Sequence, residues 1–201
     1  MPVRLIELAN LSNDEIKRLA VLHHSVMHTL LSDLGLPMVQ RYYQSAQTDP
    51  DVIGLSAISE RGDMLGWAMG SPHPDKINAA LRSPFAWFLI QMSRVALTRP
   101  LVAWQLMSTV LSSSSQAALK TGEIELTYIG VSSTQRGKGV GKKLLHAFIE
   151  ASRSHGYHSV ILSVETDNAP AISLYQKEGF KVTRTFSEGH YQRHRMELRL
   201  A

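Results

Sequence analysis

The sequence contains no cysteine among its 201 residues. Disulfide bonds, thiolate zinc sites and cysteine nucleophiles are therefore excluded. It also lacks any uninterrupted apolar run of the ~18 residues that would suggest a membrane span. The opening stretch Met1–Leu8 has no apolar region typical of a secretory signal. These absences lead us to expect a cytoplasmic protein.

Charge and aromatic content give little support for nucleic-acid binding. The chain has 21 Lys and Arg against 17 Asp and Glu, a formal net charge of +4, and so small an excess is ordinary for a soluble domain. Aromatic residues are scarce around the basic stretch 138–143, so the stacking platforms typical of single-strand binding are missing there. The length suits one well-filled core. We therefore expect 1–201 to form a single domain that does not bind nucleic acid.

Strand-like and helix-like patterns alternate along the chain. Ser12 with Glu15 has the spacing of a capping box, which marks a helix start. Between about 72 and 120, apolar residues recur at helical spacing, which predicts two or three helices inserted between strands. In the last segment Met196 and Leu198 alternate with Arg195, Glu197 and Arg199, which predicts a half-buried strand with those charged residues on its polar face. The predicted strands are 3–8, 52–58, 64–69, 123–131, 160–164, 181–186 and 191–200, and further helices are predicted from Gly139 and Asn168.

The stretch Gln135–Lys143, which reads QRGKGVGKK, carries the clearest chemical signal. Its three alternating glycines allow tight bends and close approach of a ligand to the backbone. The following helix would offer free N–H groups and the positive end of its dipole. Together these features suit a pyrophosphate.

Two common nucleotide motifs do not fit this stretch. A P-loop requires Ser or Thr after the Gly-Lys pair, where this chain has Lys143. A Rossmann fingerprint requires G-x-G-x-x-G, and the spacing here is G-x-G-x-G. On this motif alone, a plain glycine-rich turn with a solvated basic face stays open.

Three segments together resemble the GNAT superfamily of acetyltransferases. Arg136–Gly141 matches that family's [QR]-x-x-G-x-[GA] signature, and Asn168–Phe180 is similar to its N-x-x-A-x-x-L-Y-x-x-x-G-F block. Glu125–Val131 resembles its fourth strand. The resemblance implies an α/β (α+β) fold with a mixed, mostly antiparallel twisted sheet flanked by helices. Here an extra helical insertion, about 72–120, precedes the fourth strand.

The resemblance also implies a function. Such a protein would be an acyl-CoA-dependent N-acetyltransferase, with acetyl-CoA as co-substrate and no metal. It would transfer the acetyl group by direct attack of a primary amine of a small molecule or peptide. A non-catalytic CoA-binding sensor of the same fold is the alternative.

The family pattern assigns positions to the co-substrate. The fourth strand would bulge and part from the fifth, leaving a gap for the pantetheine arm. Asn168 and Tyr175 would flank the thioester. The remaining implied CoA contacts are Ile129, Gly130 and Val131 for pantetheine, with Arg136, Gly137, Lys138, Gly139, Val140, Gly141 and Lys142 for the pyrophosphate.

Two carboxylates and one phenol are the candidates for proton transfer. Glu123 and Glu125 are two apart on one strand and therefore share a face. We prefer Glu125 as the base because it lies nearer the expected bulge. The alternative is that both are charged residues at a strand end without a catalytic role. Tyr175 holds the position of the family's general acid, and its alternative is a half-buried tyrosine.

Weaker signals point elsewhere. His24 and His28 have a helical spacing that could bind a metal, but no third ligand is evident, so we expect none. The stretch 85–107 could dock on a membrane. We expect instead that it packs on the sheet or forms a homodimer face, with Trp87 and Trp104 buried.

Overall fold

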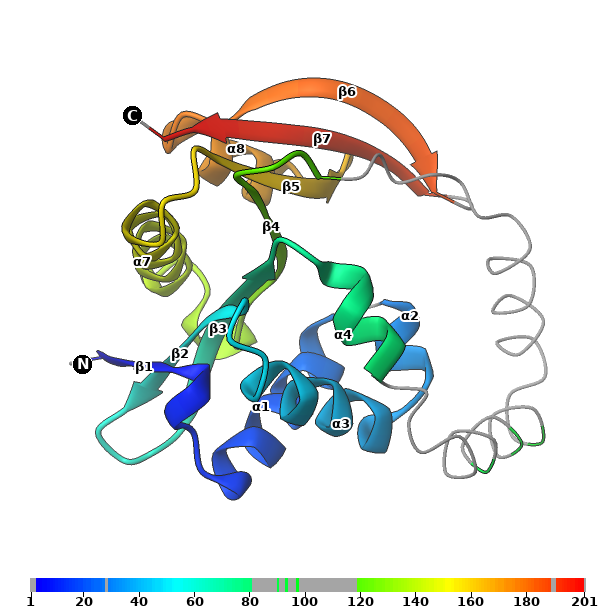
Figure 1. Cartoon of the computed structure of the whole chain (residues 1–201). Coiled ribbons are helices and arrows are strands. Elements are labelled where there is room, and N and C mark those ends of the chain that lie inside the picture. The colour runs from blue at the N-terminus through cyan, green and yellow to red at the C-terminus, as the bar shows by residue number, and fades with distance from the viewer. Residues whose placement is uncertain are drawn as a thin grey trace.

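The computed structural model describes residues 3–27, 29–80, 90, 93, 97, 119–188 and 191–200. Seven strands form one sheet in the order β1-β2-β3-β4-β5-β7-β6 (Figure 1). Every neighbouring pair is antiparallel except β4 and β5, which are parallel. This confirms the predicted mixed, mostly antiparallel sheet. The strands are β1 (Val3–Glu7), β2 (Ile53–Ser59), β3 (Met64–Ser71), β4 (Glu123–Val131), β5 (Ser159–Glu165), β6 (Lys181–Glu188) and β7 (Tyr191–Arg199).

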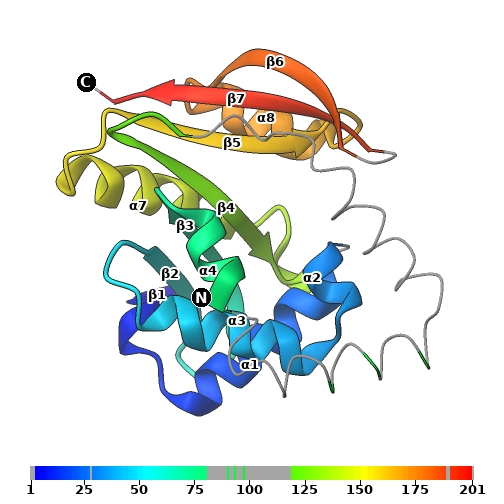
Figure 2. The same cartoon turned by 45° about the vertical axis from the view of Figure 1, so that its right-hand side comes forward.

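Helices lie against both faces of the sheet (Figures 1 and 2). One core joins α1 and α3 to β3, and a second joins α7 and α8 to the strands from β2 to β5 and to β7. The described helices are α1 (Asn13–Val26), α2 (Leu30–Asp33), α3 (Leu36–Gln47), α4 (Pro74–Ala80), α7 (Val140–Ser154) and α8 (Ala169–Lys177), with short 3₁₀ turns η1 (Leu8–Asn10) and η2 (Ser133–Gln135).

The predicted start of α1 is confirmed in detail. The backbone N–H of Glu15 donates to Ser12 Oγ at 3.3 Å, and the N–H of Ser12 donates to the Glu15 carboxylate at 2.8 Å. This capping box satisfies two amides that a helix start otherwise leaves without partners. The short helix α2 was not predicted.

The predicted insertion is only partly described. The helix α4 begins it, and α4 contacts α3. Trp87, Trp104 and most of the predicted dimer face lie outside the described residues, which include only 90, 93 and 97 of that stretch. No helix in the described part of the chain is long and apolar enough to cross a membrane.

Strand β4 parts from β5 half-way along its length. The two strands pair only from Glu123 to Leu126, opposite Ser159 to Leu162. At the same point the register between β3 and β4 shifts. Gly70 pairs with Leu126, whereas Met69 pairs with Tyr128, so the register skips Thr127. We call the divergence of β4 and β5 beyond this point the fork. The bulge and the divergence expected of the fourth strand are confirmed.

Glycine at position 70 permits this geometry. A Cβ there would overlap the carbonyl oxygen of Glu125 and lie 2.5 Å from the Phe148 ring. Real Cβ atoms do not approach other atoms so closely, so a larger residue would push β3 away from β4. Close backbone approach of β3 to the bulge therefore depends on the missing side chain.

A buried aromatic cluster supports the other face of β3 and β4. The fully buried His23 on α1 lies with its ring centroid 5.4 Å from Trp67 and 4.9 Å from Tyr128. Its Nδ1 is 2.7 Å from the hydroxyl of Tyr43, and Tyr42 packs edge-on against Tyr43. Burial lowers the pKa of His23 to about 4 from its ordinary 6.5.

This shift predicts a pH-dependent stability. The unfolded chain binds the His23 proton more readily than the folded protein does, so stability is complete above pH 6.5 and falls as the pH drops towards 4. The loss from this group is ~3 kcal/mol of unfolding free energy. Urea unfolding between pH 4 and 7 should show a shallower dependence in His23→Gln than in the parent. Equal slopes would contradict the role assigned to His23.

Candidate functional site

The turn between β4 and α7 has an open backbone surface. Gly137 and Gly139 have φ of +75° and +82°, in the left-handed region that favours glycine. A Cβ at either position would meet nothing within 4 Å among the described atoms. The left-handed backbone of the turn therefore favours glycine at both positions, and no described atom fills the space beside them.

The start of α7 presents its amides to that space. The first bond of the helix runs from the Lys143 N–H to the Gly139 carbonyl at 3.0 Å, and no described side chain caps the helix. The amides of Val140, Gly141 and Lys142 precede that bond and have no partner within the helix. With the positive end of the dipole, they form a surface suited to a phosphate.

Gly141 lies close to the end of β4 and to α8. A Cβ on Gly141 would lie 3.4 Å from Val131 and 3.9 Å from Leu174, which are ordinary contacts. Lys142 forms an ion pair with Glu178 at the end of α8, with Nζ 3.5 Å from Oε1. Arg136 and Lys138 are exposed on the same turn. The predicted pyrophosphate residues are therefore brought together.

Among the described residues, the end of β4 pairs on one edge only, with β3. Ile129, Gly130 and Val131 face Ala68, Trp67 and Gly66 of β3, while β5 has already diverged on the other side. Gly130 lies directly beneath the Trp67 ring, where a Cβ would be 2.5 Å from two ring carbons. The backbone edge that would pair with pantetheine therefore faces the fork.

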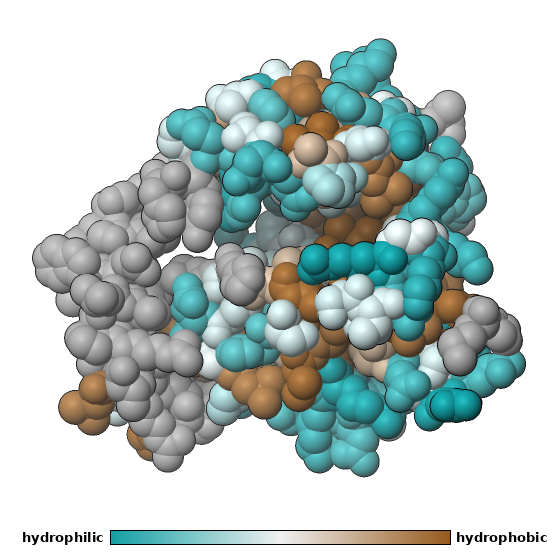
Figure 3. Space-filling model, turned by 180° about the vertical axis from the view of Figure 1, so that it is seen from behind, coloured by the Kyte–Doolittle hydropathy of each residue, from teal (hydrophilic) through white to brown (hydrophobic). Residues whose placement is uncertain are grey.

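Seen from behind, the surface is hollowed in the same region. The hollow in Figure 3 lies between the part that holds β5, β6, β7 and α8 and the part that holds β1 to β3, α1 and α3. A separate cavity of about 280 Å³, between the end of α3 and α4, is lined by Ser45, Asp49 and Lys76 among others. Its lining contains none of the predicted site residues.

Glu125 lies at the base of the fork in a buried ion pair with Arg195. Arg195 Nη1 donates to Glu125 Oε1 at 2.8 Å and to Ser163 Oγ at 3.2 Å, and Nη2 lies 3.5 Å from Glu125 Oε2. Glu125 is 8% exposed and Arg195 7%. The pair therefore links β4, β5 and β7 where β4 and β5 part. Arg195 alternates with the core residue Met196 on β7 as predicted, but the sequence did not predict that it is buried beside Glu125.

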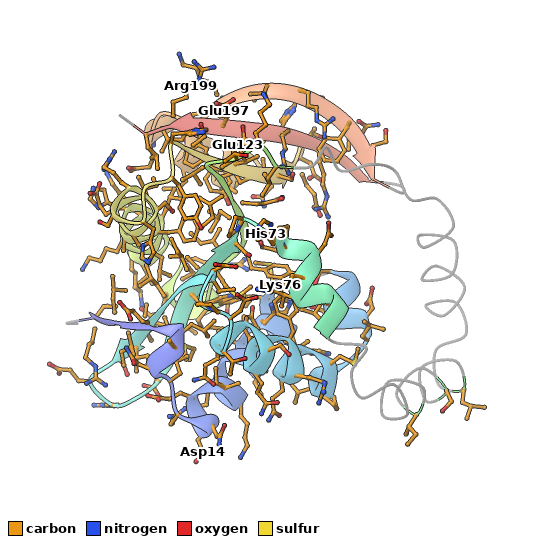
Figure 4. All side chains as sticks on the ribbon, in the orientation of Figure 1. Asp14, His73, Lys76, Glu123, Glu197 and Arg199 are labelled. Atoms are coloured by element: carbon orange, nitrogen blue, oxygen red, sulfur yellow. The ribbon has the colours of Figure 1, made fainter. Side chains whose placement is uncertain are left out.

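Glu123 has a different setting from Glu125. Its Oε2 accepts the N–H of Lys120 at 2.9 Å and closes the turn that precedes β4. Figure 4 shows it with Glu197 and Arg199 at the end of the sheet opposite to the fork. The two carboxylates lie two apart on a regularly paired stretch of β4, but they have different hydrogen-bond partners.

Tyr175 lies on α8, the helix after β5, and Asn168 immediately precedes that helix. Tyr175 is 7% exposed and packs against Phe180 at a centroid distance of 5.8 Å. Burial raises its pKa to about 12, so the phenol keeps its proton across the neutral range. Asn168 Oδ1 accepts the Ala171 N–H at 3.3 Å and caps the helix as predicted.

In the part of the chain that the structure describes, no group of three or more His, Asp or Glu side chains could hold a metal ion. His24 is exposed on α1, and His28 lies outside the described residues.

A sequence model described as the Acetyltransferase (GNAT) family matches residues 21–180, well over half of the chain. The protein belongs to the GNAT acetyltransferase family. This confirms the family resemblance drawn from Arg136–Gly141 and Asn168–Phe180.

Solved structures of this GNAT fold cover the whole chain at low sequence identity. The ribosomal-protein-S18-alanine N-acetyltransferase of Escherichia coli has a TM-score of 0.63 and 14% identity, over 100% of this chain and 95% of that one. The PaiA N-acetyltransferase of Thermoplasma acidophilum, solved in complex with coenzyme A, has a TM-score of 0.61 and 14% identity, over 100% of both chains. At this identity the likeness shows the fold alone.

Curated relatives match over short segments. Mycothiol acetyltransferase of Corynebacterium glutamicum (strain R) is 45% identical over 58 residues, 29% of this chain and 20% of its own length. An L-methionine sulfoximine/L-methionine sulfone acetyltransferase of Pseudomonas paraeruginosa is 42% identical over 53 residues, 26% of this chain and 31% of its own. The chain therefore spans less than a third of either relative.

Proposed function

We propose that this GNAT protein is an N-acetyltransferase that moves an acetyl group from acetyl-CoA to a primary amine. The observation that carries the proposal is the fork. There β4 leaves β5 after Leu126, and the uncapped amides of α7 follow at the end of the same strand. Strand β4 thus carries the buried carboxylate of Glu125, and the turn after it leads to α7, whose first amides suit a phosphate. A GNAT structure solved with coenzyme A shares this fold.

In this proposal the α7 amides hold the pyrophosphate. The backbone from Gly137 to Lys142 supplies N–H donors, and Arg136 and Lys138 add positive charge nearby. Ile129 to Val131 offer the free strand edge to the amide groups of pantetheine. The thioester then lies towards the base of the fork.

The reaction requires that the amine lose a proton and that the departing thiolate gain one. The neutral amine attacks the thioester carbon, a C–N bond forms, and the C–S bond breaks. We assign the acceptance of the amine proton, directly or through water, to Glu125 rather than Glu123, because Glu123 closes a turn away from the fork. Tyr175 donates a proton to the departing thiolate.

The acceptor is not carried over from the relatives. Their names refer to different compounds, among them mycothiol, L-methionine sulfoximine, L-methionine sulfone and an alanine of ribosomal protein S18. Release of free thiol from acetyl-CoA across an amine library tests the activity. CoA binding without any acetylation would favour the sensor alternative.

The phosphate assignment predicts that two glycine variants lose CoA affinity for different reasons. Gly141→Ala adds a methyl group at ordinary contact distance, so the fold should tolerate it while the phosphate approach is crowded. Gly139→Ala adds backbone strain as well. We expect each to raise the Kd for CoA roughly tenfold or more, about 1.4 kcal/mol, by calorimetry.

Gly62→Ala is the matched control for Gly139→Ala. Gly62 has φ of +84° in the β2–β3 turn, and its Cβ would also meet nothing within 4 Å. The strain is therefore alike, and only the position differs. CoA affinity unchanged in both Gly139→Ala and Gly141→Ala would exclude the phosphate site proposed at α7.

The acid role predicts a selective kinetic loss in Tyr175→Phe. The ring and its packing on Phe180 are kept, and only the hydroxyl is removed. We expect kcat to fall ~10²–10⁴-fold with the Kd for CoA nearly unchanged. Tyr157→Phe, a half-buried tyrosine in the α7–β5 connection, should change neither value. A parental kcat in Tyr175→Phe when chemistry limits the rate would rule out the acid role.

A further inference from the structure

A carboxylate lies beside the start of α7, where the pyrophosphate of CoA is proposed to bind. Lys142, in the first turn of that helix, has its Nζ 3.5 Å from Glu178 Oε1. Glu178 is the residue that caps the end of α8. A negative charge next to a phosphate site repels the phosphate. Glu178 therefore opposes the binding that the α7 amides favour.

Glu178 is the more firmly held member of this ion pair. Its side chain is 14% exposed, whereas that of Lys142 is 67% exposed. Just after Glu178 the chain turns back on α8, where the N–H of Phe180 donates to the carbonyl of Tyr175 at 3.0 Å. The Phe180 ring is buried against Tyr175. The carboxylate is therefore fixed at the end of α8, whereas the lysine side chain is free to turn in solvent.

The side chain of Lys142 is within reach of a phosphate at the start of α7. Its own amide is one of the three that precede the first bond of the helix, so the side chain leaves the backbone within the proposed site. A lysine ammonium has three N–H donors on a flexible four-carbon stem. Its 3.5 Å separation from Glu178 exceeds the ~2.7–2.9 Å of a strong charge-assisted hydrogen bond. Moving from Glu178 to a phosphate therefore breaks no strong bond.

We propose that Glu178 competes with the pyrophosphate of CoA for the ammonium group of Lys142, and thereby weakens CoA binding and speeds CoA release. This inference rests on the proposed function and adds a positioning residue to its co-substrate site. Acetyl-CoA and CoA carry the same pyrophosphate, so the competition weakens the binding of both. The CoA product must leave before the next acetyl-CoA can bind. A site that holds the pyrophosphate less tightly is therefore vacated sooner.

The test is the affinity of Glu178→Gln for CoA, measured by calorimetry. The substitution keeps the shape of the side chain and removes its charge, which leaves Lys142 to the phosphate. We expect the Kd for CoA to fall roughly threefold, the scale of an exposed ion pair. Damage to the fold would raise the Kd instead, so a fall distinguishes competition from a structural role. A Kd that is unchanged or raised would overturn the inference.

Lys142→Met shows whether Glu178 acts through the lysine. Alone, it should raise the Kd for CoA, because one cation of the site is lost. In this background Glu178→Gln should lose most of its effect, since two residues that act through one contact are not additive. An equal gain in both backgrounds would mean that Glu178 repels the phosphate directly, which would refute the competition for Lys142.

Glu150→Gln is the matched control. Glu150 pairs with Arg153 on the same helix, so this substitution also removes the carboxylate of a surface ion pair. Glu150 lies about 12 Å along α7 from Lys142, which exceeds the Debye length of about 8 Å in physiological salt. The Kd for CoA should keep its parental value. A gain equal to that of Glu178→Gln would mean that net charge alone matters, and would also overturn the inference.

Turnover separates this inference from the proposed function. In the active enzyme Glu178→Gln should lower the KM for acetyl-CoA, and stopped-flow displacement should show slower release of CoA. Tighter CoA binding in Glu178→Gln without acetylation of any amine would support the inference and refute the proposed function. Acetylation with the same Kd and the same release rate in both proteins would support the function and refute the inference. A parent protein that binds no CoA would refute both.

Discussion

Strand β4 cannot follow both of its neighbours along its whole length. Its pairing with β5 ends at Leu126, whereas its pairing with β3 continues through a bulge near Thr127. Everything in the proposed site depends on that divergence. It exposes the β4 edge from Ile129 to Val131, and it directs the chain into the glycine turn that starts α7. The missing Cβ at Gly70 allows the backbones to approach at the bulge.

Two cores hold the divergence in place from opposite faces. The aromatic cluster around His23 and Trp67 fixes β3 and the end of β4, while Leu144 and Phe148 of α7 fill the core on the other face. Between them, the Glu125–Arg195–Ser163 bonds join β4, β5 and β7. Removing one member of such a pair leaves a buried charge without its partner, which is strongly destabilising.

Local patterns in the sequence predicted local features well. The capping box at Ser12, the cap at Asn168 and the glycine turn before α7 each depend on residues close together in the chain, and each was found. The bulge and the fork were expected only through the family resemblance. The contacts that join Glu125, Arg195 and Ser163 were not predicted. These residues lie up to 70 positions apart in the sequence, and the strand order brings them together. Alternation along β7 predicted the face of Arg195, but it carries no information on what covers that face.

The proposed function requires that CoA bind along the β4 edge of the fork and at the start of α7. The most direct measurement is a titration of ¹⁵N-labelled protein with CoA, followed by amide chemical shifts. We expect the largest changes at Ile129–Val131 and Gly137–Lys142, with little change around the cavity lined by Ser45, Asp49 and Lys76. Changes gathered at that cavity, or spread without preference for the fork, would contradict it.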